Sequence, residues 1–293
     1  MQDTEPYSKQ TGVDALTPLE LPQVDVGVFG GSGFYDLLDD ATEYRLTTPF
    51  GAPSDVVTVG RIGDRTVAFL PRHGRGHALP PHRINYRANV WAMKMLGVTR
   101  LIGPSASGSL QPEVKPGDFV IVDQFVDRTQ ARADTFFDGS APEGVPFFEG
   151  RGVVHVSAAD PYCPELRALA GESCDRLGIS AHKSGTSVVI QGPRFSTRAE
   201  SQWFSRAGWE VVNMTQYPEG FLARELELCY VNIALITDYD AGVDSAQAVT
   251  NKEVMDVFAQ NLEKLKALLY DLIPRIPRER YCLCGSALSA AEM

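Results

Sequence analysis

Short apolar runs alternate with longer amphipathic stretches along most of the chain, and this alternation predicts an α/β fold. Apolar runs of strand length lie at 24–29, 56–59, 66–70, 101–102, 119–122, 187–190, 211–212 and 229–237. Stretches with helical periodicity lie at 85–96, 164–177, from about 197, at 218–228 and at 251–272. Strands that alternate with helices favour a largely parallel sheet flanked by helices. The run at 229–237 is apolar at nearly every position, as expected of a strand buried on both faces.

A single domain accounts for this pattern. Gly63 and Asp64 separate two strand-like runs and suit a two-residue hairpin turn, so we expect a mixed rather than a purely parallel sheet. No linker, composition shift or internal repeat interrupts the middle of the chain. We therefore predict a mobile N-terminal tail at 1–22, a domain at 23–273 and a C-terminal segment at 274–293. The Gly-, Pro- and Phe-rich connection at 128–152 has the length typical of a functional or disordered loop.

Composition narrows the choice of partners. Of the 293 residues 44% are hydrophobic, which allows a sizeable core, and the net charge of −10 argues against nucleic acid or an anionic membrane as a partner. No apolar run reaches the roughly 18 residues of a membrane span, and the polar N-terminus does not resemble a signal peptide. The five cysteines, an odd number in a long chain, imply no disulfide framework. We expect a cytoplasmic protein that binds small molecules.

The chemically distinctive residues follow the predicted strands where these end, and ligands of open α/β sheets bind at that edge. A glycine turn at 30–33 exposes backbone amides, Ser32 adds a hydroxyl, and Arg72 offers a two-pronged guanidinium; this set suits a phosphate. Ser105 and the amide of Ala106 follow the next strand. Each of these loops taken alone also fits an ordinary surface turn.

Asp238 and Asp240 follow the buried run at 229–237. Two residues apart in an extended chain, they point the same way. In a partly desolvated pocket one of two neighbouring carboxyl groups can hold a proton at neutral pH. Such a group can donate to a leaving ring nitrogen while its neighbour accepts from an amine. The spacing is equally compatible with two solvated carboxylates at a strand exit.

Other classes of site fit the sequence poorly. The dinucleotide spacing Gly-x-Gly-x-x-Gly fails because Asp36 stands where the third glycine belongs, which disfavours an NAD-linked oxidoreductase. Glycines and prolines between His73, His77 and His82 prevent one helix from aligning them, so we expect no zinc site there. The segment 103–107 lacks the last glycine of the hydrolase elbow.

Eight segments, in order, together resemble the trimeric purine nucleoside phosphorylase superfamily and, within it, the 5′-methylthioadenosine phosphorylase branch. They are GVFGGSGFYD, TPFGAPSD, LPRHGRGHALPPHRINYRAN, SASGSLQPEVKPGDFVIVDQFVDRT, IQGPRFSTRAES, NMTQYPE, LARELELCY and TDYDAG. The resemblance runs from about Val24 to Leu272. It implies a single α/β domain of the nucleoside phosphorylase type, a homotrimer with sites at subunit interfaces, inorganic phosphate as co-substrate, and no metal or organic cofactor.

The resemblance also assigns roles to residues. It implies a phosphate held by Ser32, Arg72, His73, Ser105, Ala106 and Thr215. It implies a nucleoside held by Phe195, Ser196, Met214, Thr237, Val254, Met255 and, from a neighbouring subunit, His155. Asp238 would hydrogen-bond purine N7 as the acid, and Asp240 would accept from the 6-amino group. Cleavage of an N-glycosidic bond builds positive charge on the sugar, which an attacking phosphate can stabilise. The expected products are adenine and 5-methylthioribose 1-phosphate.

Two positions indicate which purine base the protein prefers. Relatives that use 6-oxopurines usually carry Asn in place of Asp238 and Glu in place of Ser196, so this chain has the aminopurine pattern at both. Asn251 is polar where some relatives are apolar, which would let a 5′-hydroxyl compete with the thioether. The alternatives are a phosphorylase with broader adenosine or 6-oxopurine use, a hydrolytic nucleosidase, and a non-catalytic nucleoside-binding protein.

The C-terminal segment contains Cys282-Leu283-Cys284. Some relatives carry a similar Cys-x-Cys, in places disulfide-bonded. In a cytoplasmic protein we expect two free thiols, with a strained redox pair as the alternative.

Overall fold

The computed structural model describes residues 21–30, 38–140, 142–243, 250–289 and 291. Its strands are β1 (Val26–Gly30), β2 (Asp39–Tyr44), β3 (Val57–Ile62), β4 (Arg65–Pro71), β5 (Arg100–Ser109), β6 (Phe119–Ile121), β7 (Gln124–Arg128), β8 (Ala181–His182), β9 (Thr186–Ile190), β10 (Val211–Asn213) and β11 (Cys229–Tyr239). Its α-helices are α1 (Tyr86–Met95), α2 (Pro164–Leu177), α3 (Arg198–Arg206), α4 (Gln216–Glu225) and α5 (Asn251–Arg275). Short 3-10 turns cover Arg75–His77, Pro81–Arg83, Pro146–Phe148 and Leu283–Ser286.

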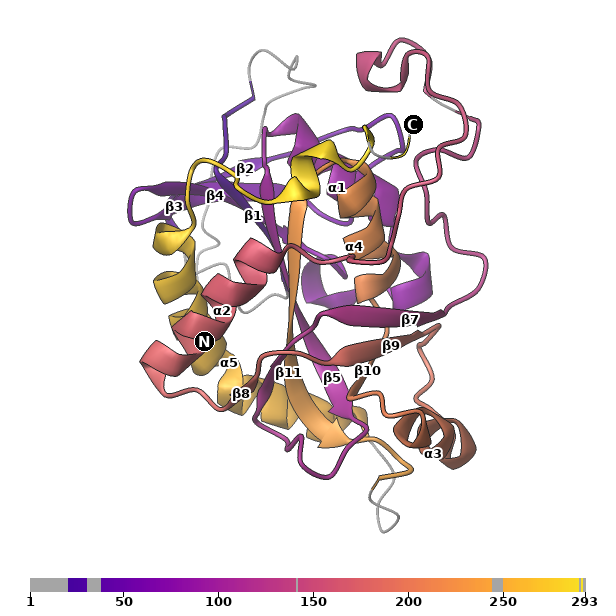
Figure 1. Cartoon of the computed structure of the whole chain (residues 1–293). Coiled ribbons are helices and arrows are strands. Elements are labelled where there is room, and N and C mark those ends of the chain that lie inside the picture. Colours follow the sequence, from indigo (N-terminus) through magenta and orange to yellow (C-terminus); the bar gives the residue numbers. More distant parts are fainter. Residues whose placement is uncertain (1–20, 31–37, 141, 244–249, 290, 292–293) are drawn as a thin grey trace, which may run out of the picture.

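The described strands form one sheet in which β5 is the branching strand (Figure 1). β1 and β11 both pair with β5 in parallel, whereas β10 pairs with its second half in antiparallel fashion. The order continues from β1 to β4, β3 and β2 on one side and from β10 to β9 and β7 on the other, while β11 leads to β6 and β8. The hairpin of β3 and β4 turns at Gly63 and Asp64 as predicted. The predicted mixed, largely parallel sheet is confirmed.

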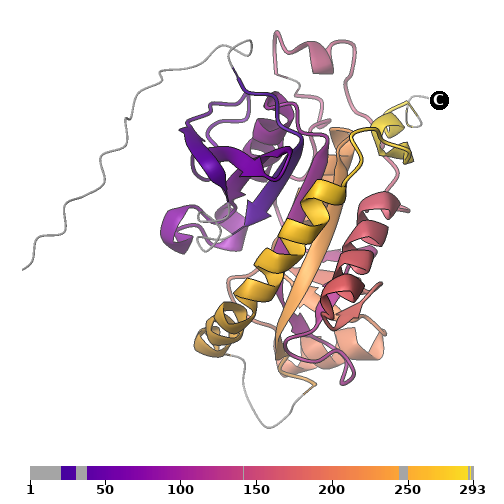
Figure 2. The ribbon, with the colours of Figure 1, turned by 90° about the vertical axis from the view of Figure 1, so that its left-hand side faces the viewer.

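Helices cover both faces of the sheet (Figures 1 and 2). α2 and α5 run side by side and pack with β1, β11 and β6 around one core, which contains Leu166, Ile233 and Leu268. α1 and α4 pack on the opposite face, around a core that contains Val90 and Leu222. Every residue of β11 from its start to Thr237 is buried, because this strand lies between the two helical layers. The prediction of a strand buried on both faces is therefore confirmed.

Local signals place the helix ends close to where the sequence predicts them. The Asn85 side chain accepts from the backbone N–H of Ala88 at the start of α1. Thr197 and Glu200 form a reciprocal capping box on α3. Gly178 ends α2 with φ of 64°, a left-handed conformation that favours glycine.

Two kinds of prediction were wrong. α5 continues through Pro274 to Arg275 instead of ending near 272, because a proline in the last turn removes only one N–H donor. The second half of β5, 104–109, belongs to the strand and not to a loop, because it pairs with both β10 and β11. The sequence analysis also missed β2, β7 and β8, which lie at the ends of the sheet. Such strands are partly exposed and lack an apolar pattern.

Several predictions lie outside the described residues. They concern most of the N-terminal tail, the turn residues 31–33 with Ser32, and the side chain of Asn251. None of the helices in the described ranges combines the length and the apolar composition that crossing a membrane requires.

Candidate active site

Several of the predicted site residues lie around the second half of β5. Arg72 and His73 follow β4, Thr237 and Asp238 lie in β11, and Met214 and Thr215 follow β10. β10 runs antiparallel to β5, so its last residue returns to the middle of β5 instead of continuing past it. The second half of β5, which the sequence analysis placed in a loop, therefore supports the residues of the site.

Arg72 is held by a carboxylate that the sequence analysis did not assign. Its Nε and Nη2 atoms donate to Oε2 and Oε1 of Glu219 at 2.5 and 2.7 Å, and Nη1 donates to the Pro104 carbonyl at 3.0 Å. Both side chains are buried. Burial alone would lower the pKa of the guanidinium, but Glu219 outweighs this effect and raises the pKa. Contacts within the described part of the chain occupy three of the five N–H groups, which leaves two for a ligand.

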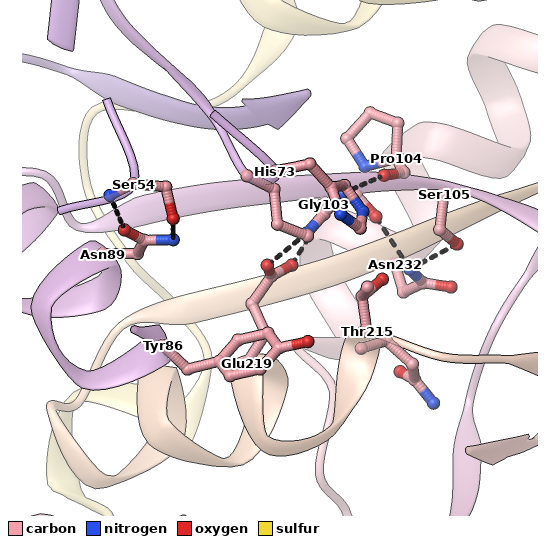
Figure 3. A network of polar contacts seen from close by, with 12 residues as sticks. Ser54, His73, Tyr86, Asn89, Gly103, Pro104, Ser105, Thr215, Glu219 and Asn232 are labelled. Atoms are coloured by element: carbon pink, nitrogen blue, oxygen red, sulfur yellow. Dashed lines mark hydrogen bonds and ion pairs between the residues drawn. The ribbon is translucent and has the colours of Figure 1, made fainter. Parts of the chain in front are cut away.

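Two buried asparagines organise the residues next to Arg72. Asn232 donates to the Gly103 carbonyl at 2.7 Å and to the Ser105 hydroxyl at 3.1 Å. Asn213 accepts from the backbone N–H of Thr215 at 2.7 Å and donates to the Ala106 carbonyl at 3.1 Å. In Figure 3 the carboxylate of Glu219 points toward the strand of Gly103, Pro104 and Ser105, with Thr215 beside it. Ser105 and Thr215 thus lie in one hydroxyl-bearing region with the guanidinium.

His73 is neutral at physiological pH. Burial lowers its pKa to about 3, and the charge of Arg72 and the nearby His77 add to this effect. Its Nδ1 lies 2.9 Å from the Leu79 carbonyl, and its ring stacks on His77 at 4.1 Å. Because a carbonyl only accepts, Nδ1 carries the proton, and Nε2 remains an acceptor.

Asp238 and Asp240 lie side by side against Gly108. A Cβ placed on that glycine would come within 3.0 Å of Asp238 Oδ2 and 3.6 Å of Asp240 Cβ, so a larger residue there would displace the Asp238 carboxylate. The register of β11 against β5 shifts between Ile236 and Asp238, which makes Thr237 a bulge residue. The Thr237 hydroxyl donates to Asp238 Oδ1 at 2.7 Å. This contact fixes one carboxylate oxygen of Asp238.

The two aspartates differ in their surroundings. Asp238 is half-buried, whereas Asp240 is 2% exposed. Asp240 Oδ2 and Ser196 Oγ are both buried, and neither has hydrogen-bond geometry with any group in the described part of the chain. Burial raises the pKa of Asp240, opposed by the nearby hydroxyls of Ser201 and Ser196. A buried acceptor without a partner costs about 1–3 kcal/mol, so a ligand donor here would be stabilising.

The remaining predicted nucleoside residues are spread more widely. Phe195 is half-buried before α3, and Met214 lies against the same loop, since a Cβ on Gly192 would come within 2.7 Å of its sulfur. Val254 and Met255 lie near the start of α5, and His155 is exposed on the connection before α2. No hydrogen bond or ring contact between described residues links these last three side chains to the strand ends.

Arg132 is a further residue that the sequence analysis missed. Its guanidinium donates to the carbonyl oxygens of Tyr217 at 2.6 Å and of Gln191 and Met214 at 2.9 Å each. It also packs over the Tyr86 ring at 5.4 Å. One side chain therefore connects the loop before Phe195, the residue after β10 and the start of α4. The only sequence signal was the length of the connection at 128–152.

Comparisons with known proteins identify the family. The sequence model of the phosphorylase superfamily matches residues 25–274. A purine nucleoside phosphorylase of Streptomyces coelicolor is 52% identical over 92% of this chain and 96% of its own. An S-methyl-5′-thioadenosine phosphorylase of Thermofilum pendens is 50% identical over 92% of this chain and 99% of its own.

Comparison with solved structures indicates the same family. The methylthioadenosine phosphorylase of Schistosoma mansoni in complex with adenine superposes with a TM-score of 0.83 at 37% identity, covering 92% of this chain and 96% of that one. The resemblance to nucleoside phosphorylases, predicted from eight segments, is confirmed. This chain is an enzyme that belongs to the phosphorylase superfamily.

Proposed function

We propose that this enzyme cleaves 5′-methylthioadenosine with inorganic phosphate, releasing adenine and 5-methylthioribose 1-phosphate. The observation that carries the proposal is the pair of aspartates at the end of β11, where the buried Asp240 Oδ2 has no hydrogen-bond partner among the described residues. An exocyclic 6-amino group has the donor that this atom requires. Relatives named as methylthioadenosine phosphorylases support the same substrate.

The phosphate would bind beside the ends of β4 and β1 and the middle of β5. Arg72 offers its two remaining N–H groups, and Glu219 fixes the orientation of the guanidinium. Ser105 accepts from Asn232, and its hydroxyl, which lies 3.4 Å from that of Ser107, would donate to an oxyanion. The neutral His73 would accept the hydrogen of a monoprotonated phosphate at Nε2. Ser32, Ala106 and Thr215 complete the proposed set of phosphate ligands.

The purine would bind at the end of β11. As the bond from the sugar carbon to the purine nitrogen breaks, its electron pair passes to the base, and a phosphate oxygen bonds to the sugar carbon. Asp238, held at Oδ1 by Thr237, would hydrogen-bond N7 and donate the proton that neutralises the departing base. Asp240 would accept from the 6-amino group beside Ser196. No metal or organic cofactor enters this mechanism.

The sugar and the thioether would bind next to the loops that Arg132 connects. Met214 would lie along the ribose, Phe195 on the purine, and Val254 and Met255 near the methylthio group. We further propose a homotrimer in which His155 reaches the site of a neighbouring subunit, in keeping with its exposure on the single chain. Sedimentation analysis of the wild type, with kinetics of His155→Ala, tests this arrangement.

A phosphorylase with broader purine use is the second candidate. It is favoured by the Streptomyces coelicolor relative, which is named a purine nucleoside phosphorylase. The Asp238 and Ser196 pattern favours aminopurines instead. Inosine is the substrate that distinguishes these two candidates.

The experiment is base release from methylthioadenosine, adenosine and inosine, each with and without phosphate. Phosphate-dependent release from methylthioadenosine with inosine inert supports the proposal. Equal release without phosphate would indicate a nucleosidase, and turnover of inosine would indicate the broader enzyme. Asp238→Asn should lose activity, whereas Asp64→Asn, at the exposed β3–β4 turn, should keep it. Nucleoside binding without any turnover would indicate a binding protein.

A further inference from the structure

Four of the five cysteines, distant in sequence, meet at the end of the sheet opposite to the candidate active site. Cys163 immediately precedes α2, Cys229 begins β11, and Cys282 and Cys284 lie at the Leu283–Ser286 turn. In Figure 1 the yellow C-terminal segment passes over the upper end of β11. Asp238 lies nine residues further along the same strand, about 30 Å away at 3.3 Å per residue. The cluster is therefore separate from the catalytic groups.

The spacing of the sulfur atoms is that of ligands around one ion. All four Sγ atoms lie within 4.8 Å of one another. Cys282 Sγ is 3.3 Å from that of Cys229 and 3.6 Å from that of Cys163. A zinc ion bound tetrahedrally by thiolates at about 2.3 Å holds them about 3.8 Å apart. Four sulfur ligands in this geometry are typical of zinc.

Positively polarised groups lie next to the sulfur atoms. Arg100, which is 2% exposed, donates to Cys229 Sγ at 3.1 Å and to Glu165 Oε2 at 2.6 Å. Cys163 occupies the N-cap position of α2, where the helix dipole stabilises negative charge and the side chain makes no capping hydrogen bond. Zinc with four thiolates carries a net charge of about −2, which a buried guanidinium and a helix N-terminus partly balance.

The burial of the cysteines indicates a metal site that is closed to solvent. Three of the cysteines are buried, and Cys282 is half-buried, so an ion would enter from its side. Four protein ligands leave no position for water or substrate, which is the arrangement of structural zinc sites. The Arg100 side chain also donates to the carbonyl oxygens of Pro277 and Glu279, on the chain that leads into the cluster. The C-terminal segment is thus held at the cluster both by its own cysteines and by the contacts of Arg100 with the residues that precede them.

We propose that Cys163, Cys229, Cys282 and Cys284 bind one zinc ion, which fastens the C-terminal segment to the starts of β11 and α2. The ion is structural and takes no part in phosphorolysis. The proposal replaces the expectation of two free thiols at Cys282 and Cys284. It is independent of the function proposed above.

The test uses untagged full-length protein purified without chelator or reductant that binds metal. Elemental analysis should find about one zinc per chain. Cys282→Ala should lose the zinc and unfold at a lower temperature. Cys174→Ala is the matched control, because Cys174 is buried in the same helical layer but lies outside the cluster. It should keep the zinc.

A second measurement does not depend on any variant. Wild-type protein stripped of metal, fully reduced and loaded with Co²⁺ should show the absorption of tetrahedral cobalt bound to thiolates. Absence of both zinc and this absorption would overturn the proposal. If, in addition, fewer than five thiols titrate in denaturant before reduction, the cysteines form a redox pair instead.

Discussion

Arg72 and Glu219 lie 147 residues apart in sequence, yet they form a buried ion pair with two contacts of 2.5 and 2.7 Å at the proposed phosphate site. The Tyr230 hydroxyl also donates to Glu219 Oε1, at 2.8 Å. The carboxylate thus neutralises most of the charge that the arginine would otherwise present. We infer that the site recognises phosphate through oriented N–H and O–H donors more than through net positive charge.

Glu219→Gln should therefore destabilise the fold and weaken phosphate binding together. Removing one partner of a buried ion pair leaves an uncompensated charge, which typically costs about 3–5 kcal/mol. Denaturant unfolding should show a loss of this size, and KM for phosphate should rise. Glu263→Gln is the control, because this exposed partner of Lys266 should contribute less than about 1 kcal/mol. Equal effects of the two substitutions would contradict the buried role of Glu219.

Asp240→Asn should change both base preference and the pH dependence of stability. An amide is a weaker acceptor than a carboxylate toward a 6-amino group. The ratio of kcat/KM for methylthioadenosine to kcat/KM for inosine should therefore fall at least tenfold, which corresponds to about 1.4 kcal/mol. Burial raises the pKa of Asp240 above its unfolded value. The folded state therefore binds the proton more tightly, and this stabilisation is lost as pH rises through the folded pKa.

The Asn variant cannot ionise, so the ligand-free variant should gain stability relative to wild type as pH rises. Thermal unfolding at several pH values without ligand measures this gain. A difference between the two proteins that does not change with pH would show that Asp240 does not titrate as its burial implies.

Arg132→Lys should impair nucleoside use more than phosphate use. A lysine cannot bind three separate carbonyl oxygens with the fixed geometry of a guanidinium, so the loops around Phe195 and Met214 should lose their alignment. We expect kcat/KM for the nucleoside to fall by roughly tenfold to a hundredfold, since misplacement of about 1 Å has effects of this order. KM for phosphate should change little.

Arg61→Lys, on the exposed side of the β3–β4 hairpin, is the matched control and should leave both parameters unchanged. A parallel loss of phosphate and nucleoside affinity in Arg132→Lys would indicate a general loss of structure instead of positioning.

Because of Glu225, the free energy of unfolding should fall as pH rises from mildly acidic to neutral. Burial raises its pKa to about 7, although it accepts hydrogen bonds from the Thr135 hydroxyl at 2.6 Å and the Phe136 N–H at 2.7 Å. Because the folded pKa exceeds the unfolded value, its stabilising effect is complete below about pH 4.5 and lost as pH rises through about 7. The loss of free energy of unfolding from this group is on the order of 3–4 kcal/mol.

Glu225→Gln should remove this part of the pH dependence. The free energy of unfolding, measured by denaturant from mildly acidic to mildly alkaline pH, should vary less in the variant than in the wild type. Identical pH profiles for the two proteins would place the titration elsewhere.

Sequence alone determined the elements whose local signals agree with their packing. The run of β11 is apolar at nearly every position because both of its faces are covered. The ends of α1, α2 and α3 follow from Asn85, Gly178 and Thr197, whose side chain or backbone freedom satisfies the helix termini locally. The eight ordered segments also identified the superfamily before any contact was known. For the strand and the helix ends the information lies within a few neighbouring residues, and for the superfamily it lies in short segments along the chain.

Tertiary structure alone decided the contacts between distant residues. The second half of β5 became a strand because β10 and β11 pair with it, although its Pro, Ser and Gly residues suggest a loop. Glu219, Arg132 and the four-cysteine cluster acquire their roles from partners that lie from 53 to 147 residues away. Local pattern cannot encode such contacts, because the same side chain in the same motif would be an exposed charge or a free thiol until the sheet brings its partner within hydrogen-bonding or ligand distance.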